Sequence, residues 1–171
     1  MIGRGLTRLA ATLSLAALLA LGGCSRAQHA GDSAWVAEAV RRHALADQRL
    51  EAGDGPAARD ALAGIVNARI PDDVPAADRR GVLQDTYFRL ARIDLDARDP
   101  RAALADADGG LALGVAPDLF VANLLVVRGA AHEALGQGPA AAEDYHQALV
   151  INDRLLAETL DAAPRTPGAA P

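Results

Sequence analysis

The sequence predicts an all-α protein made of three consecutive helix pairs. Apolar residues at helical spacing lie on both sides of three short breaks, at 53–56, 99–100 and 136–139, and each break contains a proline placed to open the second helix of a pair. Aromatic residues make up only 3% of the chain, so Ala and Leu must fill the core. The length of 171 residues indicates a single domain.

Residues 1–23 predict a signal peptide that is not part of the fold. Arg4 and Arg8 precede an apolar stretch over 9–21, which is short for a membrane span of about 20 residues. This stretch ends in Leu21-Gly22-Gly23-Cys24, which resembles the bacterial lipobox. The resemblance implies cleavage before Cys24, attachment of lipid such as palmitate to its thiol, and acylation of the new N-terminus. An ordinary secretory signal and a lone buried cysteine are the alternatives.

The stretch 24–32 is expected to be the lipidated cysteine followed by a flexible tether. Ser25 follows the cysteine, where an Asp would favour retention in the inner membrane, so the resemblance implies an outer-membrane lipoprotein facing the periplasm. Several acyl chains anchor a protein firmly where a single chain is marginal. Loss of Arg4 and Arg8 leaves 15 basic against 22 acidic residues, a net charge of −7. This charge argues against a nucleic-acid partner.

The helical domain is expected over 33–161. Its first helix begins near Asp32 or Ser33, either of which can cap it, and continues to about Ala52. Pro56 then opens the second helix, whose apolar residues run from Ala58 to Val66.

The second pair follows residues 69–78, which contain two Pro and three Asp. They predict either a long connection or a helix that starts at Pro75. The third helix ends near Arg98, with Asp99 as the cap and Pro100 as the first residue of the fourth helix. Gly109 and Gly110 weaken that helix by about 1 kcal/mol each relative to Ala.

The third pair carries the clearest pattern, over residues 123–153. Gly136 is expected just past the end of a helix, where a missing Cβ makes a left-handed φ cheap, and Pro139 opens the next helix. Gly129 and Ala141 leave room for the two helices to pack closely. An apolar stripe on the last helix consists of Tyr145, Ala148, Leu149 and Ile151.

Residues 154–160 extend the last helix and are expected to seal the end of the molecule through Leu155, Leu156 and Leu160. Residues 162–171 contain three prolines and predict a disordered tail.

The third pair resembles a tetratricopeptide repeat (TPR). Leu125 and Gly129 match the fourth and eighth positions of that pattern, and Ala141, Tyr145 and Ala148 match the twentieth, twenty-fourth and twenty-seventh. His132 and Asp153 depart from the preferred Tyr and Pro. The resemblance implies a short right-handed α-solenoid of about three such pairs, since one pair cannot bury its own apolar face.

The other two pairs match the TPR pattern less completely. The second pair has Tyr87, Ala91 and Ala103 at the fourth, eighth and twentieth positions, and Gly110 at the twenty-seventh. The first pair has Ala46 and Ala58, but Arg42 fits the fourth position poorly. The helix-opening prolines are 44 and 39 residues apart, against about 34 in a standard TPR. The excess lies in the connections at 69–78 and 114–118.

In TPR proteins the first helix of each pair lines a concave groove that binds a partner. Carried over by position, the resemblance implies a groove that also presents Leu50, Glu51, Asp85 and Ala130 and has these main candidate residues: His43, Asp47, Phe88, Arg89, Arg92, Asp96, Asn123, Val126 and Glu133. The carboxylate clamp of some TPR domains is not expected, because only Arg89 supplies a charge of the required sign. The groove charges also have a plainer interpretation as a solvated helix face.

Catalytic and metal sites are not predicted. His132-Glu133 lacks the second His that a zinc-protease helix needs four residues on. Asp144, Tyr145 and His146 are neighbours in sequence and so lie on different helix faces. No Ser or Cys has the setting of a nucleophile, and no Gly-rich loop follows a strand. We therefore expect no enzyme, no cofactor and no metal.

The sequence favours a lipid-anchored adaptor or scaffold that binds a protein or peptide in its groove. The alternative is a small α-helical lipoprotein that binds a small ligand between its helices. An enclosed apolar pocket favours the alternative, whereas an open charged groove favours the adaptor.

Overall fold

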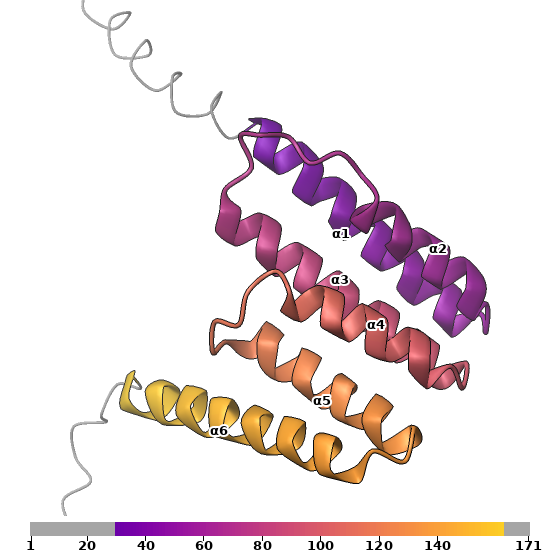
Figure 1. The fold of residues 1–171 in the computed structure, drawn as a ribbon. Coiled ribbons are helices and arrows are strands. Elements are labelled where there is room, and N and C mark those ends of the chain that lie inside the picture. The colour runs from indigo at the N-terminus through magenta and orange to yellow at the C-terminus, as the bar shows by residue number, and fades with distance from the viewer. Residues whose placement is uncertain (1–29, 163–171) are drawn as a thin grey trace, which may run out of the picture.

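The computed structural model describes residues 30–162, with side chains from Ala34 onward, and these residues form six α-helices and no strand (Figure 1). The all-α prediction is therefore confirmed for this part of the chain. The helices are α1 (Ala30–Glu51), α2 (Gly55–Val66), α3 (Ala76–Asp96), α4 (Pro100–Leu111), α5 (Leu119–Ala134) and α6 (Gly138–Ala162).

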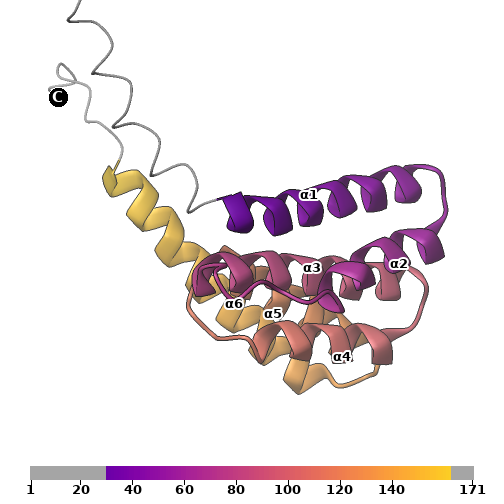
Figure 2. The ribbon, with the colours of Figure 1, turned by 90° about the horizontal axis from the view of Figure 1, so that it is seen from above.

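The helices pack in chain order. Each helix contacts the next one along the chain, and α3 also contacts α1 and α5. Figure 1 shows the pairs one below another, from α1 and α2 at the top to α6 at the bottom. Seen from above in Figure 2, α6 extends well beyond the other helices at its C-terminal end.

The three turns within the pairs share one backbone conformation. Gly53, Arg98 and Gly136 each have a left-handed φ, of 75°, 62° and 74°. The predicted left-handed Gly136 is confirmed, while Arg98 adopts this conformation without being a glycine. The side chain of Asp99 accepts a hydrogen bond of 3.0 Å from the backbone N–H of Ala102, which confirms it as the cap of α4.

Small residues lie where the helices approach one another. The alanines expected at the helix contacts are all buried: Ala46, Ala58, Ala91, Ala103, Ala141 and Ala148. A Cβ on Gly129 would lie 2.7 Å from the ring of Tyr145, and one on Gly110 would lie 2.6 Å from Leu124. Gly109 and Gly110 thus lower the helix propensity of α4 but let Tyr87 and Leu124 pack closely against it. The sequence alone did not reveal this packing role.

Two boundary predictions differ from the structure. Helix α1 begins at Ala30, inside the stretch expected to be a tether, and not at Asp32 or Ser33. The last turns of α6 do not seal the molecule, because Leu156 and Leu160 are 58% and 65% exposed and only Leu155 is half-buried. These turns lie beyond the end of α5, so no helix among residues 30–162 is placed to cover them.

The predicted signal peptide, Cys24 and most of the tail lie outside the described residues. Within 30–162, no helix combines the length and the apolar character needed to cross a bilayer.

Candidate functional site

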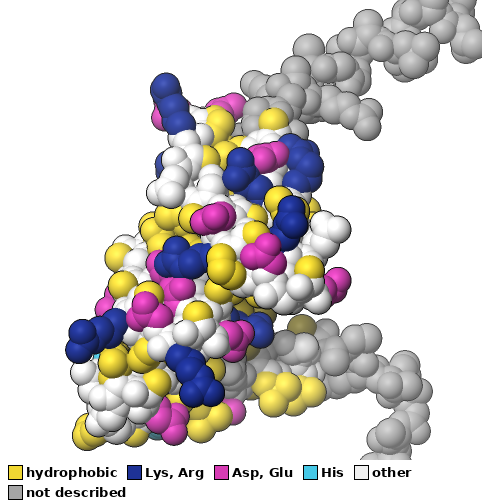
Figure 3. Space-filling view, turned by 90° about the vertical axis from the view of Figure 1, so that its right-hand side faces the viewer, with side chains coloured by type: hydrophobic (Ala, Val, Ile, Leu, Met, Phe, Trp, Pro, Cys, Tyr) yellow, Lys and Arg dark blue, Asp and Glu magenta, His cyan; other side chains and the backbone are white. Residues whose placement is uncertain are grey.

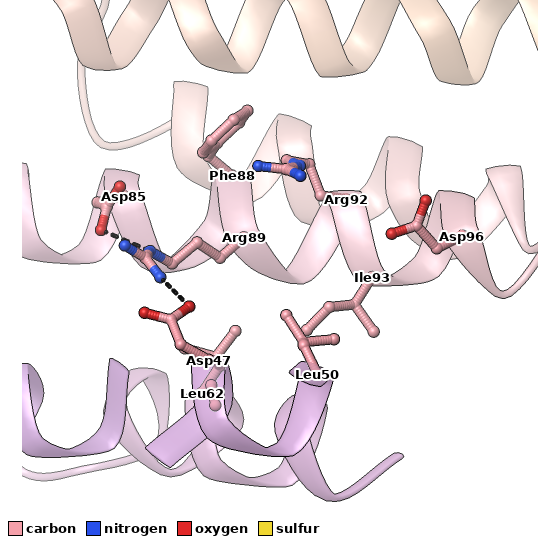
Figure 4. A pocket seen from close by; sticks show the side chains of 10 residues that line it. Asp47, Leu50, Leu62, Asp85, Phe88, Arg89, Arg92, Ile93 and Asp96 are labelled. Carbon is pink, nitrogen blue, oxygen red and sulfur yellow. Dashed lines mark hydrogen bonds and ion pairs between the residues drawn. The ribbon is translucent and has the colours of Figure 1, made fainter. Parts of the chain in front are cut away.

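A groove runs between α1 and α3, as Figure 4 shows from close by. It encloses about 290 Å³. Five of its ten lining residues are charged. The full lining is Ala46, Asp47, Leu50, Leu62, Asp85, Phe88, Arg89, Arg92, Ile93 and Asp96. Five of the main candidate residues therefore meet in one place, namely Asp47, Phe88, Arg89, Arg92 and Asp96, together with the predicted Leu50 and Asp85.

Arg89 bridges the two walls of this groove. Its guanidinium donates to Asp47 of α1 at 2.9 Å and to Asp85 of α3 at 3.0 Å (Figure 4). Arg89 is thus held by two carboxylates from helices that are about 40 residues apart in the chain. Its charge is already balanced, so its main effect is to fix α1 against α3.

Phe88, Arg92 and Asp96 are spaced four residues apart on α3, so they lie on one face of that helix. The guanidinium carbon of Arg92 lies 5.6 Å from the centroid of the Phe88 ring, within the range of a cation–π contact. Among the described residues, neither Arg92 nor Asp96 has an ion-pair partner. Phe88 is half-buried and packs into the core between α3 and α5. The groove therefore offers one uncompensated cation and one uncompensated anion.

The sequence predicts His43 on the groove surface, but the residue is largely buried against α3 and does not line the cavity. Its side chain is only 15% exposed. Burial, and then the charge of Arg89, lower the pKa of its imidazole. Its Nε2 is 2.9 Å from the Thr86 hydroxyl, and its Nδ1 is 3.5 Å from Asp85. His43 thus helps to position α1 on α3.

Asp85, His43 and Thr86 supply a carboxylate, an imidazole and a hydroxyl in the order found in a catalytic triad. A nucleophilic role would require the hydroxyl to be accessible to a substrate. Thr86 is fully buried, and its hydroxyl donates to the backbone oxygen of Val82 at 2.7 Å. A substrate carbonyl cannot reach a hydroxyl in that position. The cluster is a packing contact between the two helices.

A second cavity continues the groove toward the α1–α2 turn. It encloses about 480 Å³ and shares Leu50, Ile93 and Asp96 with the first. Pro56 and Arg59 of α2 form its far wall. The sequence did not predict these residues as part of the site, because they belong to the second helix of the first pair. Their proximity to α3 depends on how the pairs pack.

Arg59 is held at the edge of this cavity by two carboxylates. It donates to Asp94 at 2.7 Å and to Asp106 at 2.9 Å, so the cluster joins α2, α3 and α4. Burial, together with a hydrogen bond to Asp94, raises the pKa of Asp106 to about 6, against an ordinary value of 3.8. The cluster therefore takes up a proton under mildly acidic conditions.

The predicted site residues of α5 do not reach this groove. Asn123, Val126 and Glu133 are absent from the lining of both cavities. Val126 is 43% exposed, and Glu133 accepts a hydrogen bond of 3.0 Å from the Tyr145 hydroxyl. The groove cavity is thus confined to the first two pairs.

On the face viewed in Figure 3, acidic and basic side chains are interspersed with apolar ones. Within residues 30–162, no cluster of three or more His, Cys, Asp or Glu side chains has an arrangement that would hold a metal ion. A comparison of the sequence with protein-family models finds no match. No curated protein is significantly similar to it in sequence.

Proposed function

We propose that this protein is a lipid-anchored, TPR-like adaptor of the bacterial envelope, attached to the outer membrane and facing the periplasm. It binds a protein or peptide partner in the groove between α1 and α3. The observation that carries this proposal is the open groove itself, in which charged side chains of two helices surround the apolar residues Leu50 and Ile93. Mixed polar and apolar linings of this kind suit protein partners.

The six helices are proposed to form a short right-handed α-solenoid of three TPR-like pairs. Support comes from the positions where the TPR pattern requires small residues. Ala91 and Ala103 of the second pair are fully buried, and Gly129 of the third pair lies directly under the ring of Tyr145. Contacts that run mainly between consecutive helices are those expected of a solenoid.

The lipid anchor rests on the lipobox-like sequence that ends in Cys24. Replacement Cys24→Ser is expected to release the protein from membranes while its helical circular dichroism stays unchanged, because the fold begins several residues later. Membrane fractions washed with salt provide the measurement. A Ser variant that stays with the washed membranes contradicts the anchor.

A small ligand between the helices is the second candidate. The cavity of about 480 Å³ beside Leu50 and Pro56 favours it, because its volume suits a small molecule. However, several residues around it, including Gly53, Asp96 and Ala97, are exposed, so the cavity opens to solvent. This openness favours a side chain of a partner over an enclosed ligand.

The groove is best tested at Arg92, which lines the cavity and whose only charge-related contact among the described residues is with Phe88. A photo-crosslinking amino acid in place of Arg92 is expected to trap a partner protein in envelope extracts. The matched control carries the same group in place of Arg101, an exposed residue of α4 outside the groove. Equal trapping at both positions, or none at either, contradicts the groove as the binding surface. Arg89 is not a clean probe, because its removal leaves Asp47 and Asp85 uncompensated.

A further inference from the structure

The second and third helix pairs can be compared position by position. Arg98 and Gly136, which share the left-handed turn conformation, are 38 residues apart in the sequence. The starts of α4 and α6, at Pro100 and Gly138, have the same separation. Residues that differ by 38 in number therefore hold equivalent places in the two pairs.

Helix α5 covers one face of the second pair. It contacts both α3 and α4, and its Val127 and Ala131 pack in one cluster with Phe88 and Leu104. Leu111 at the end of α4 is buried to 8% exposure, in a cluster with Leu124 and other residues of α5. A single helix lying between the two helices of a pair thus buries this face.

The equivalent positions of the third pair are uncovered. Val126 replaces Phe88 and is 43% exposed, and Leu149 replaces Leu111 and is 56% exposed. Leu156 continues the same stripe two turns further along α6 and is also exposed. The C-terminal end face is defined here as Val126, Ala142, Tyr145, Leu149 and Leu156. Exposed apolar residues gathered on one face in this way mark an interaction site, and Asp153 is the charged residue among them.

We propose that the C-terminal end face binds an amphipathic α-helix of a partner protein, which lies between α5 and α6 as α5 lies between α3 and α4. The face continues the interface that already joins the second and third pairs, so the same geometry is available to the next helix. The structure also gives the pattern of the occupant. On α5 the inward apolar residues are Val121, Leu124, Val127 and Ala131, which follow helical spacing.

Charge indicates that this helix is basic. Glu133 of α5 stands where the second pair has Leu95, and Asp153 lies between Leu149 and Leu156 on α6. The nearby Arg154 is turned toward Glu158 and the backbone oxygen of Pro117. The face therefore carries two acidic side chains, one of them between its leucines, and Lys or Arg on a partner helix complements them.

A second copy packed head to tail is a poor source of such a helix. Head-to-tail packing would place α1 on the end face, and the turns at Gly53 and Arg98 set the equivalence of α1 and α3 at 45 residues. The inward residues of α3 are Leu83, Thr86, Leu90 and Ile93, and they then correspond to Glu38, Arg41, Leu45 and Gln48 of α1. Three of these four α1 residues are polar, so this surface offers only Leu45 as an apolar partner for Leu149.

The test uses a synthetic peptide as long as α5, with Val, Leu, Val and Ala at the spacing of the inward α5 residues and Lys on the remaining faces. A scrambled peptide of the same composition is the control ligand. Binding is measured by fluorescence polarisation against the full chain. The patterned peptide is expected to bind, and Leu149→Asp is expected to weaken it at least about tenfold.

Val150→Asp is the matched control variant, because Val150 is the next residue on α6, is 54% exposed and lies on a different face of the helix. It is expected to change the affinity by less than about twofold. Equal binding of the two peptides, or an equal effect of the two variants, overturns the proposal. A wild-type dimer in light scattering that Leu149→Asp dissociates also overturns it, because the occupant is then a second copy. Arg92 lies outside this face, so failure of the groove proposal leaves this test unaffected.

Discussion

At its N-terminal end the molecule presents Glu38, Arg41 and Gln48 of α1 to solvent, whereas at its C-terminal end it presents Val126 and Leu149. These residues occupy the positions through which neighbouring helix pairs contact one another inside the molecule. At the first end they are polar, and Arg41 and Glu38 form an ion pair of 2.7 Å. At the second end they remain apolar although no described helix covers them.

The two ends of the molecule therefore differ in the polarity of their outer faces. Helical repeats need a polar outer face at their ends to stay soluble, and α1 largely meets that requirement, although its Leu45 is 40% exposed. Helix α6 does not, so its end face is built for a contact that the described chain leaves open. The predictions below test this contrast, in order of decreasing effect.

The strongest test compares one position in a covered and an uncovered pair. Leu111→Ala is expected to lower the free energy of unfolding by about 2–4 kcal/mol, because Leu111 is buried under α5. Leu149→Ala, its exposed equivalent, is expected to cost less than about 0.5 kcal/mol. Urea denaturation of the two variants provides the measurement. Similar losses in both would mean that the α6 face is covered in solution and that the two ends do not differ.

The second test concerns the packing of α5 against α6 in the third pair. Gly129→Leu is expected to cost about 1–3 kcal/mol, because the new side chain would displace the Tyr145 ring, which leaves only 2.7 Å to a Cβ at this position. Gly138→Ala serves as the control, since nothing lies within 4 Å of a Cβ there. It is expected to change stability by less than about 0.5 kcal/mol. Equal shifts in melting temperature for the two variants contradict close packing of α5 on α6.

The third test uses the ion clusters of the two halves. Arg59 binds two adjacent carboxylates, Asp94 and Asp106, whereas in the C-terminal half His132 holds the position equivalent to Asp94 and lies 3.7 Å from Asp144. The pKa of Asp106 is raised from 3.8 to about 6, so the folded state takes up a proton that the unfolded state releases. The protonated Asp106 carboxyl therefore contributes stability that is present below about pH 4 and is lost as the pH rises through about 6.

Asp106→Asn keeps this group uncharged at every pH. Its stability relative to wild type is therefore expected to rise by about 2–3 kcal/mol between pH 4 and pH 7. Unfolding curves at a series of pH values measure this difference. Asp73→Asn, which removes an exposed carboxylate from the connection before α3, is the control. A difference between Asp106→Asn and wild type that is flat with pH would show that Asp94 and Asp106 do not share a proton.

The sequence by itself determined the helices and the turns between them. Gly136 predicted a left-handed residue, Asp99 a cap and Gly129 a close helix contact, and all three are present in the structure. Each of these features depends on backbone sterics or on residues within a few positions, so a local pattern is enough to reveal it. The all-α class followed from the same local signals.

The tertiary structure alone decided which residues meet. It placed His43 behind the groove, tied Arg89 to Asp47, and brought Arg59 to Asp94. It also left Leu156 exposed, although the sequence predicted that this residue would seal the end. These outcomes depend on how far each pair is rotated and displaced against the next. That relation joins residues about 40 positions apart, and the long connections between the pairs hide it from any local pattern.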